Sequence, residues 1–135
     1  MDCRRPRAVT FRVTAPAVLG LAALMCGGAA ANERGRVLFE PCRACHALDP
    51  AAAPTAGPNL AGIVGRRIAG DPHFDYSLVL REAAAGKAVW TLEKLDTFLT
   101  DPEAMFPGMW MTAPRMADQT DRQALVRFLA DPGSR

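Results

Sequence analysis

Apolar residues recur at helical spacing in four parts of this chain, and each part predicts a helix. The four parts are residues 33–40, residues 77–85, residues 92–99 and the segment that follows Asp118. In residues 92–99 the apolar side chains fall on one stripe, as they do in the last segment at Leu125, Phe128 and Leu129. Valine and isoleucine are sparse and no segment alternates convincingly, so the fold class is predicted to be all-α.

Residues that start and stop helices stand at the ends of these segments. Ser77, Thr91 and Asp118 are the predicted N-caps, because their short polar side chains can accept hydrogen bonds from the first free backbone N–H groups. Gly86 ends the second helix. Asp101 followed by proline predicts one further helical turn, since proline is favoured at the first position of a helix.

Residues 50–73 are rich in glycine, proline and alanine and are predicted to form a loop. A loop of this length is unusual in so small a domain and usually surrounds a functional site. A buried prosthetic group would supply the missing core.

Composition and charge narrow the class of protein. Half of the 135 residues are hydrophobic and 22% are charged, which is typical of a globular chain. The net charge of +2 is too small to suggest a nucleic-acid-binding protein. Residues 1–31 hold four arginines and one acidic residue, so residues 32–135 carry a formal charge of −1.

Residues 1–31 have the three parts of a secretory signal peptide. A basic region ends at Arg12, an apolar stretch follows, and the alanines at 29–31 fit a cleavage site before Asn32. We therefore expect one exported, periplasmic domain at residues 32–135. The alternative is an uncleaved membrane anchor, because the 19 residues from 13 to 31 carry no charge and nearly match a bilayer-spanning length.

After cleavage, Cys42 and Cys45 are the only cysteines of the mature chain, and they form Cys-Arg-Ala-Cys-His with His46. Positions three apart on a helical turn face the same way, so both thiols can reach the vinyl groups of one haem and form thioethers. The histidine can then ligate the iron. A zinc site would need ligands beyond His73 and carboxylates, a thioredoxin-type pair needs a βαβ context, and a plain disulfide leaves His46 unexplained.

Further motifs follow in order along the chain. They are Gly57-Pro58-Asn59-Leu60 with Gly62, Gly65 and Arg66; Phe74-Asp75-Tyr76; Trp90-Thr91; Asp101-Pro102; Pro107-Gly108 with Met111; and Asp121-Arg122 with Leu125, Phe128 and Leu129. With the cysteine motif they make the chain resemble class I cytochromes c, the soluble monohaem electron carriers of the bacterial c2 and c550 type. The resemblance implies helices and long loops wrapped around one covalent haem c, with terminal helices that cross.

The resemblance also implies site residues. His46 and Met111 are the expected axial iron ligands, with Met109 as the alternative to Met111. Pro58 is expected to accept the proton on the other nitrogen of His46. Arg66, Tyr76 and Trp90 are expected to donate hydrogen bonds to the haem propionates. No residue is expected to be catalytic.

The expected function is electron transfer between redox protein partners by an exported monomer that docks transiently and meets membranes only through those partners. Two other functions stay open: a haem-based peroxidase or gas sensor in which Met111 detaches, and a cytochrome subunit of a larger oxidoreductase complex. Residues 105–111, which we call the methionine loop because they include Met111, contain no lysine. We expect Met109 or Trp110 to reach the surface beside the haem edge, so that redox partners dock there mainly through apolar contacts.

Overall fold

The structure, a computed structural model, describes residues 26–112 and 115–133. Most of the predicted signal peptide, residues 1–25, lies outside the described residues. The elements, in order, are α1 (Cys26–Phe39), η1 (Glu40–Ala44), α2 (Leu78–Ala85), α3 (Leu92–Thr100), α4 (Pro102–Met105) and α5 (Gln119–Ala130). Apart from one isolated β-bridge between Arg67 and Val89, the described residues form helices, turns and loops, as predicted.

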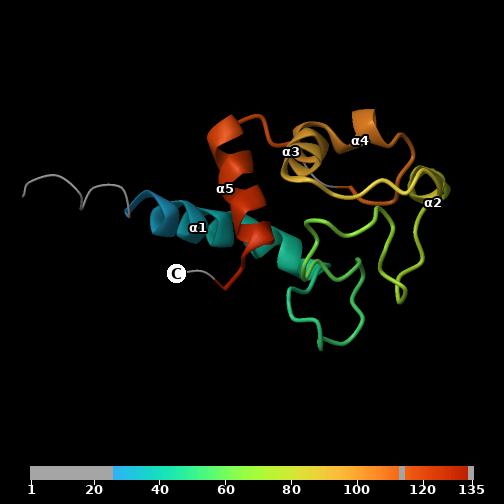
Figure 1. Cartoon of the computed structure of the whole chain (residues 1–135), viewed down its shortest axis with the longest axis horizontal. Coiled ribbons are helices and arrows are strands. Elements are labelled where there is room, and N and C mark those ends of the chain that lie inside the picture. Colours follow the sequence, from blue (N-terminus) through green and yellow to red (C-terminus); the bar gives the residue numbers. More distant parts are fainter. Residues whose placement is uncertain (1–25, 113–114, 134–135) are drawn as a thin grey trace, which may run out of the picture.

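The two terminal helices cross, and the crossing is the largest contact between elements (Figure 1). Gly35 of α1 lies so close to α5 that a Cβ there would stand 2.5 Å from Cβ of Phe128 and would overlap the backbone carbonyl of Ala124. The rings of Phe39 and Phe128 pack beside this point, with centroids 5.7 Å apart. The absence of a side chain at residue 35 therefore sets how closely the two helices approach.

Two of the three expected caps, Thr91 and Asp118, are present, and Asp101 also caps the short helix α4. Thr91 accepts a hydrogen bond from the Lys94 amide, Asp101 from that of Ala104, and Asp118 from that of Asp121. Ser77 occupies the N-cap position of α2, but its side chain makes no capping hydrogen bond. The expected helix is present, and the expected role of its first residue is wrong.

The buried core collects residues from α1, α3 and α5 and from the loops between helices, and half-buried residues of η1, α2 and α4 pack against it. Its buried members are Phe39, Ile63, Ile68, Trp90, Leu95, Phe98, Phe106, Met109, Leu125, Val126, Phe128 and Leu129. Leu92, which the sequence placed on the buried stripe of α3, is 43% exposed. The apolar stripe of α3 is therefore wider than the face that packs against α5.

Residues 46–77 run without a helix and include the loop predicted at residues 50–73, and two short backbone segments pair to hold this loop in place. The Gly65 amide donates to the Trp90 carbonyl at 2.7 Å, and the Trp90 amide donates to the Arg66 carbonyl at 2.9 Å. This ladder ties the long loop to the start of α3. Figure 1 shows the loop on the side of the molecule away from α3 and α4. None of the helices in the described ranges has the length and apolar composition needed to cross a bilayer.

Candidate haem site

The Cys-Arg-Ala-Cys-His motif forms a tight turn at the end of α1. The amides of Cys45 and His46 both donate to the carbonyl of Cys42, at 3.1 and 2.9 Å. Cys42 is half-buried and Cys45 is exposed, and both thiols are free. Burial, and then the neighbouring Cys45, raise the pKa of the Cys42 thiol. Both cysteines thus lie on one turn, and the Cys45 side chain is near enough to affect the Cys42 thiol.

His46 is buried, and its orientation is fixed from one side. Its Nδ1 lies 2.8 Å from the carbonyl oxygen of Pro58, as expected from the sequence. Because a carbonyl only accepts, Nδ1 must carry the proton, and the lone pair of Nε2 is left for a metal. Gly57 packs against the same ring, since a Cβ there would stand 2.5 Å from Cε1 of His46.

The loop with the expected methionine ligand alternates between core and solvent. Met109 is 8% exposed and belongs to the core, Trp110 is 62% exposed, and Met111 is half-buried against the core. Gly108 has a φ of +80°, and its amide donates to the carboxylate of Glu103 at 3.0 Å. Of the two residues expected to reach the surface here, Trp110 does so and Met109 does not.

Arg66 and Tyr76, two of the expected propionate donors, already have partners in the protein. Arg66 donates from its two terminal nitrogens to the carbonyls of Ala61 and Asn59. The hydroxyl of Tyr76 accepts the Asp71 amide at 3.3 Å. Burial raises the pKa of Tyr76, the Asp71 hydrogen bond and the charge of Arg66 lower it in part, and the Asp71 charge raises it. The three side chains therefore lie within electrostatic reach of one another.

Trp90, the third expected donor, is buried among aromatic rings. Its indole packs edge-on against Phe98 and Phe106, with centroids 5.2 and 6.1 Å away. These contacts hold the ring within the core beside α3 and α4.

Two buried polar atoms in this region have no hydrogen-bond partner in the protein. They are Nε of Arg66 and Oγ of Ser77. Ser77 is 2% exposed, and leaving a buried hydroxyl unpaired costs about 1–3 kcal/mol. A bound group with acceptor oxygens would satisfy both. The sequence analysis assigned Ser77 to a helix cap and did not include it among the site residues. Its position directly after Tyr76, an expected propionate donor, was the one indication of another role.

Comparison with known proteins identifies the family. The sequence profile of the cytochrome c family matches residues 32–131. This chain belongs to the cytochrome c family.

Individual relatives align with most of this chain. The chain is 36% identical to cytochrome c-550 of Ancylobacter novellus over 102 residues, which cover 73% of this chain and 95% of the relative. It is 34% identical to cytochrome c2 of Agrobacterium tumefaciens (strain II Chrys) over 96 residues, 71% of this chain and 86% of the relative. The solved structure of cytochrome c2 from Rhodospirillum centenum superposes with a TM-score of 0.67 at 28% identity, covering 73% of this chain and 94% of that one.

Membership of the cytochrome c family implies a covalently attached haem c with iron, and makes the protein an electron carrier rather than an enzyme. The residues described above fit that group. The chain offers a pair of neighbouring thiols, an imidazole with its Nε2 available, thioethers in the adjoining core, and two buried donors without partners. In the part of the chain that the structure describes, no cluster of three or more His, Cys, Asp or Glu side chains could hold a metal ion.

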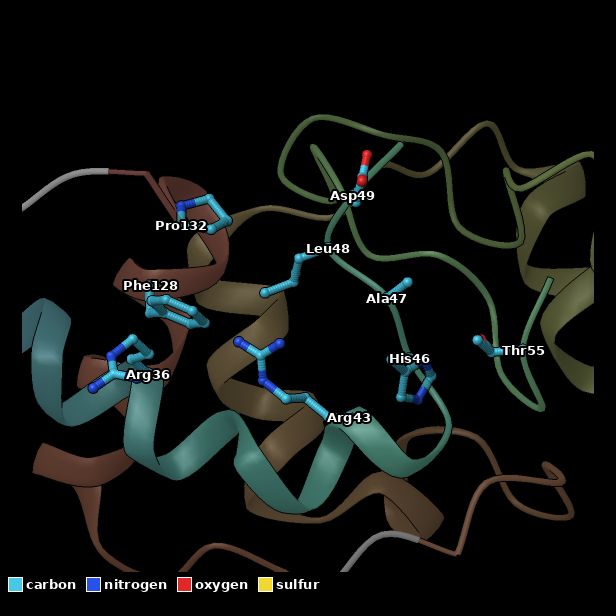
Figure 2. Close-up of a pocket in the computed structure, with 9 residues that line it drawn as sticks. All are labelled: Arg36, Arg43, His46, Ala47, Leu48, Asp49, Thr55, Phe128 and Pro132. Atoms are coloured by element: carbon cyan, nitrogen blue, oxygen red, sulfur yellow. The ribbon is translucent and has the colours of Figure 1, made fainter. Parts of the chain in front are cut away.

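Two surface clefts adjoin this cytochrome c site and share residues with it, His46 in the first and Arg66 in the second. One of about 530 Å³ is lined by Arg36, Arg43, His46, Ala47, Leu48, Asp49, Thr55, Phe128 and Pro132. In Figure 2 Arg43 extends towards Leu48 and Phe128, and His46 lies at the edge. Neither cysteine nor Met111 lines it. The other, of about 430 Å³, lies between the segments around Asn59 and Asp71.

Proposed function

We propose that this cytochrome c is an exported monohaem electron carrier that exchanges one electron at a time with protein redox partners in the periplasm. The observation that carries the proposal is the buried His46, whose Nδ1 is fixed by Pro58 directly after two neighbouring cysteines. The haem, when bound, supplies an iron that cycles between Fe(III) and Fe(II).

In this proposal the chain's own residues attach, orient and enclose the haem. Cys42 and Cys45 would hold it covalently, and His46 and Met111 would ligate its iron. Pro58 keeps the proton of His46 on Nδ1, which leaves Nε2 for the iron. If both residues ligate the iron, its coordination positions would be filled by the protein and by the haem, and the chemistry supplied would be the transfer of one electron.

We propose that the haem propionates lie near Arg66, Tyr76 and Trp90, and we add Ser77 to this set. A carboxylate among buried side chains is costly unless donors satisfy it. Nε of Arg66 and Oγ of Ser77 are the buried donors that lack protein partners in the described residues. Charge-assisted hydrogen bonds of this kind are stronger than neutral ones.

The mature protein is proposed to be a monomer of residues 32–135 after removal of a signal peptide at residues 1–31. An uncleaved membrane anchor is the alternative. Mass spectrometry of protein purified from the periplasmic fraction should give an N-terminus at Asn32. Recovery of the full-length chain in the membrane fraction would favour the anchor.

Covalent attachment is tested by extraction with acidified acetone. We expect the haem to stay on the polypeptide, and we expect single Cys42→Ala or Cys45→Ala variants to retain one thioether link or to lose the haem. Complete extraction of haem from the native protein would overturn the proposed function.

The axial ligand is tested by a matched pair of variants. Met111→Ala should lower the reduction potential and abolish the absorption band of methionine–Fe(III) ligation, because a soft neutral ligand that favours Fe(II) is lost. Met109→Ala should keep that band, although removing a buried methionine costs about 2–5 kcal/mol of stability. The reverse outcome would assign the ligand to Met109.

A further inference from the structure

Asp71 lies in the long loop and connects two of its segments. Its carboxylate accepts hydrogen bonds from the backbone amides of Asn59 and His73, at 2.8 and 3.0 Å. Its own amide donates to the hydroxyl of Tyr76. The carboxylate therefore holds the segment after Pro58 against the segment before Tyr76.

The hydrogen bond to Asn59 reaches the peptide group that orients His46. The carbonyl of Pro58 and the amide N–H of Asn59 belong to one planar peptide unit. On one side of that unit the Pro58 oxygen lies 2.8 Å from Nδ1 of His46. On the other side the Asn59 nitrogen lies 2.8 Å from Oδ2 of Asp71. A carboxylate and an imidazole thus share a single amide.

The carbonyl and the side chain of Asn59 are also hydrogen-bonded, and these bonds keep the Pro58–Asn59 peptide in its orientation. Its carbonyl accepts a hydrogen bond from Arg66. Its side-chain nitrogen donates to the carbonyl of Asp49 at 2.7 Å, and its side-chain oxygen accepts the Ala61 amide at 2.8 Å.

The carboxylate is stabilised in its charged form. Burial acts to raise the pKa of Asp71, but the hydrogen bonds from the His73 and Asn59 amides, and the charges of Arg66 and His73, together bring it below its ordinary value. A hydrogen bond to an ionised acceptor is shorter and stronger than a neutral one.

Hydrogen bonds in a chain polarise one another, and the effect is larger inside a protein than in water. Negative charge at the N–H end of the amide draws the N–H bond towards Oδ2 and leaves more electron density on the carbonyl oxygen. That oxygen then accepts the Nδ1 proton of His46 more strongly. A ligand histidine that donates a stronger hydrogen bond is more basic at its other nitrogen.

We propose that Asp71 is a positioning residue that acts on His46 through the Pro58–Asn59 peptide and lowers the reduction potential of the protein. The inference rests on the proposed role of His46 as an iron ligand. Asp71 itself touches neither the ligand nor the haem in this proposal. Its effect is to make His46 a better donor to Fe(III).

The test compares Asp71→Asn with Asp75→Asn in the purified haem-loaded protein. Asp75 carries the same charge in the same segment, but its carboxylate is exposed and pairs with Arg81 at 2.8 Å. We expect Asp71→Asn to raise the equilibrium constant for reduction by roughly threefold to tenfold, where tenfold is about 59 mV for a one-electron couple. Asp75→Asn should change it by less than about twofold, because exposed charges are screened by solvent.

Proton NMR of the Fe(II) protein supplies the second readout. The His46 Nδ1–H resonance should move upfield in Asp71→Asn, which weakens its hydrogen bond, and should stay in place in Asp75→Asn. If Asp71→Asn does not load haem, Asp71→Ser replaces the carboxylate with a neutral acceptor and should shift both readouts in the same directions.

Equal shifts of the reduction potential in the two asparagine variants, with an unmoved His46 Nδ1–H resonance, would overturn the proposal. Asp71 would then only connect two segments of the loop. Failure of the proposed function has a different signature. If His46 is not an axial ligand, its ring protons in the native Fe(II) protein will lack the large ring-current shift that a residue beneath the haem must show.

Discussion

Gly57 lies against the imidazole of His46 so closely that a Cβ atom at residue 57 would stand 2.5 Å from Cε1 and 2.8 Å from Nδ1 of that ring. The backbone at residue 57 has no left-handed conformation that would demand glycine. The requirement is therefore one of space alone. The residue keeps open the position that the ligand ring occupies between the motif turn and the long loop.

Gly57→Ala should displace His46 or push the loop away from it. Overpacking of this kind costs about 1–3 kcal/mol of the free energy of unfolding. Denaturant unfolding of the haem-loaded protein, followed by haem absorbance, measures it. The matched control is Gly86→Ala, where the nearest atom to a new Cβ, the carbonyl oxygen of Ala83, is 3.7 Å away. Equal stability of the two variants would contradict the close approach at His46.

Ser77→Ala tests whether a bound carboxylate uses the unpaired hydroxyl. If nothing bonds to the buried Oγ, alanine removes an unsatisfied polar group and should raise stability. If a haem propionate accepts from it, alanine should lower the stability of the haem-loaded protein by about 1.5–3 kcal/mol, the value for hydrogen bonds to charged groups. We expect the loss. Ser77→Thr, which keeps the hydroxyl, is the control and should restore most of the stability.

Sequence reasoning succeeded where the cause is local. Thr91 and Asp118 cap their helices because each side chain accepts a hydrogen bond from a backbone amide only three residues further along the chain. The Cys42–His46 turn is equally local. The close contact of Gly35 with α5 joins distant residues, and the crossing of the terminal helices was expected only from the resemblance to a family.

The roles of Ser77 and Asp71 could not be predicted, for different physical reasons. Ser77 has the residue type and position of a helix cap. Only the burial of its hydroxyl without a partner distinguishes the proposed role as a haem donor from that of a cap. Asp71 acts on Asn59, twelve residues away across a loop without regular structure. No periodic pattern connects two such residues, so their pairing appears only when the loop is folded.

The lowered pKa of Asp71 predicts how stability depends on pH. A carboxyl group whose folded pKa lies below its ordinary value of 3.8 stabilises the fold fully above that value and loses the contribution as pH falls through the folded pKa. The stability difference between native protein and Asp71→Asn should thus be constant from neutral pH to about pH 5 and should shrink below about pH 4. Arg66, His73 and Tyr76 face this carboxylate, and they are unchanged in the variant.

Urea unfolding at a series of pH values from 7 to 3 measures this difference. Taking it between two proteins removes the contributions of other groups that titrate in the same range. A difference that persists unchanged to pH 3, or grows there, would show that the Asp71 carboxylate is not preferentially ionised in the folded protein.

Trp110 is the most prominent apolar side chain on the methionine loop. Its indole is 62% exposed between the buried Met109 and the half-buried Met111. From residue 103 to residue 112 the loop has one charged side chain, Glu103, whose carboxylate accepts the Gly108 amide. The chain has two lysines, and one of these, Lys94, donates from Nζ to the Val89 carbonyl at 3.2 Å. The loop segment from residue 103 to residue 112 therefore has no positively charged side chain of its own.

We expect the partner to contact Trp110 through an apolar surface, so that the second-order rate of electron exchange depends weakly on ionic strength. Trp110→Lys should slow exchange with the native partner by about thirtyfold, because losing a tryptophan at the centre of an interface costs about 2 kcal/mol or more. Trp110→Phe should retain most of the rate, and Lys87→Gln, an exposed charge outside this loop, should leave it unchanged. The rates are measured by stopped-flow absorbance over a range of salt concentrations. A steep fall in the native rate as salt rises would indicate steering by charge and would reject apolar docking, since screening weakens long-range attraction between charged surfaces but leaves the burial of an indole nearly unaffected.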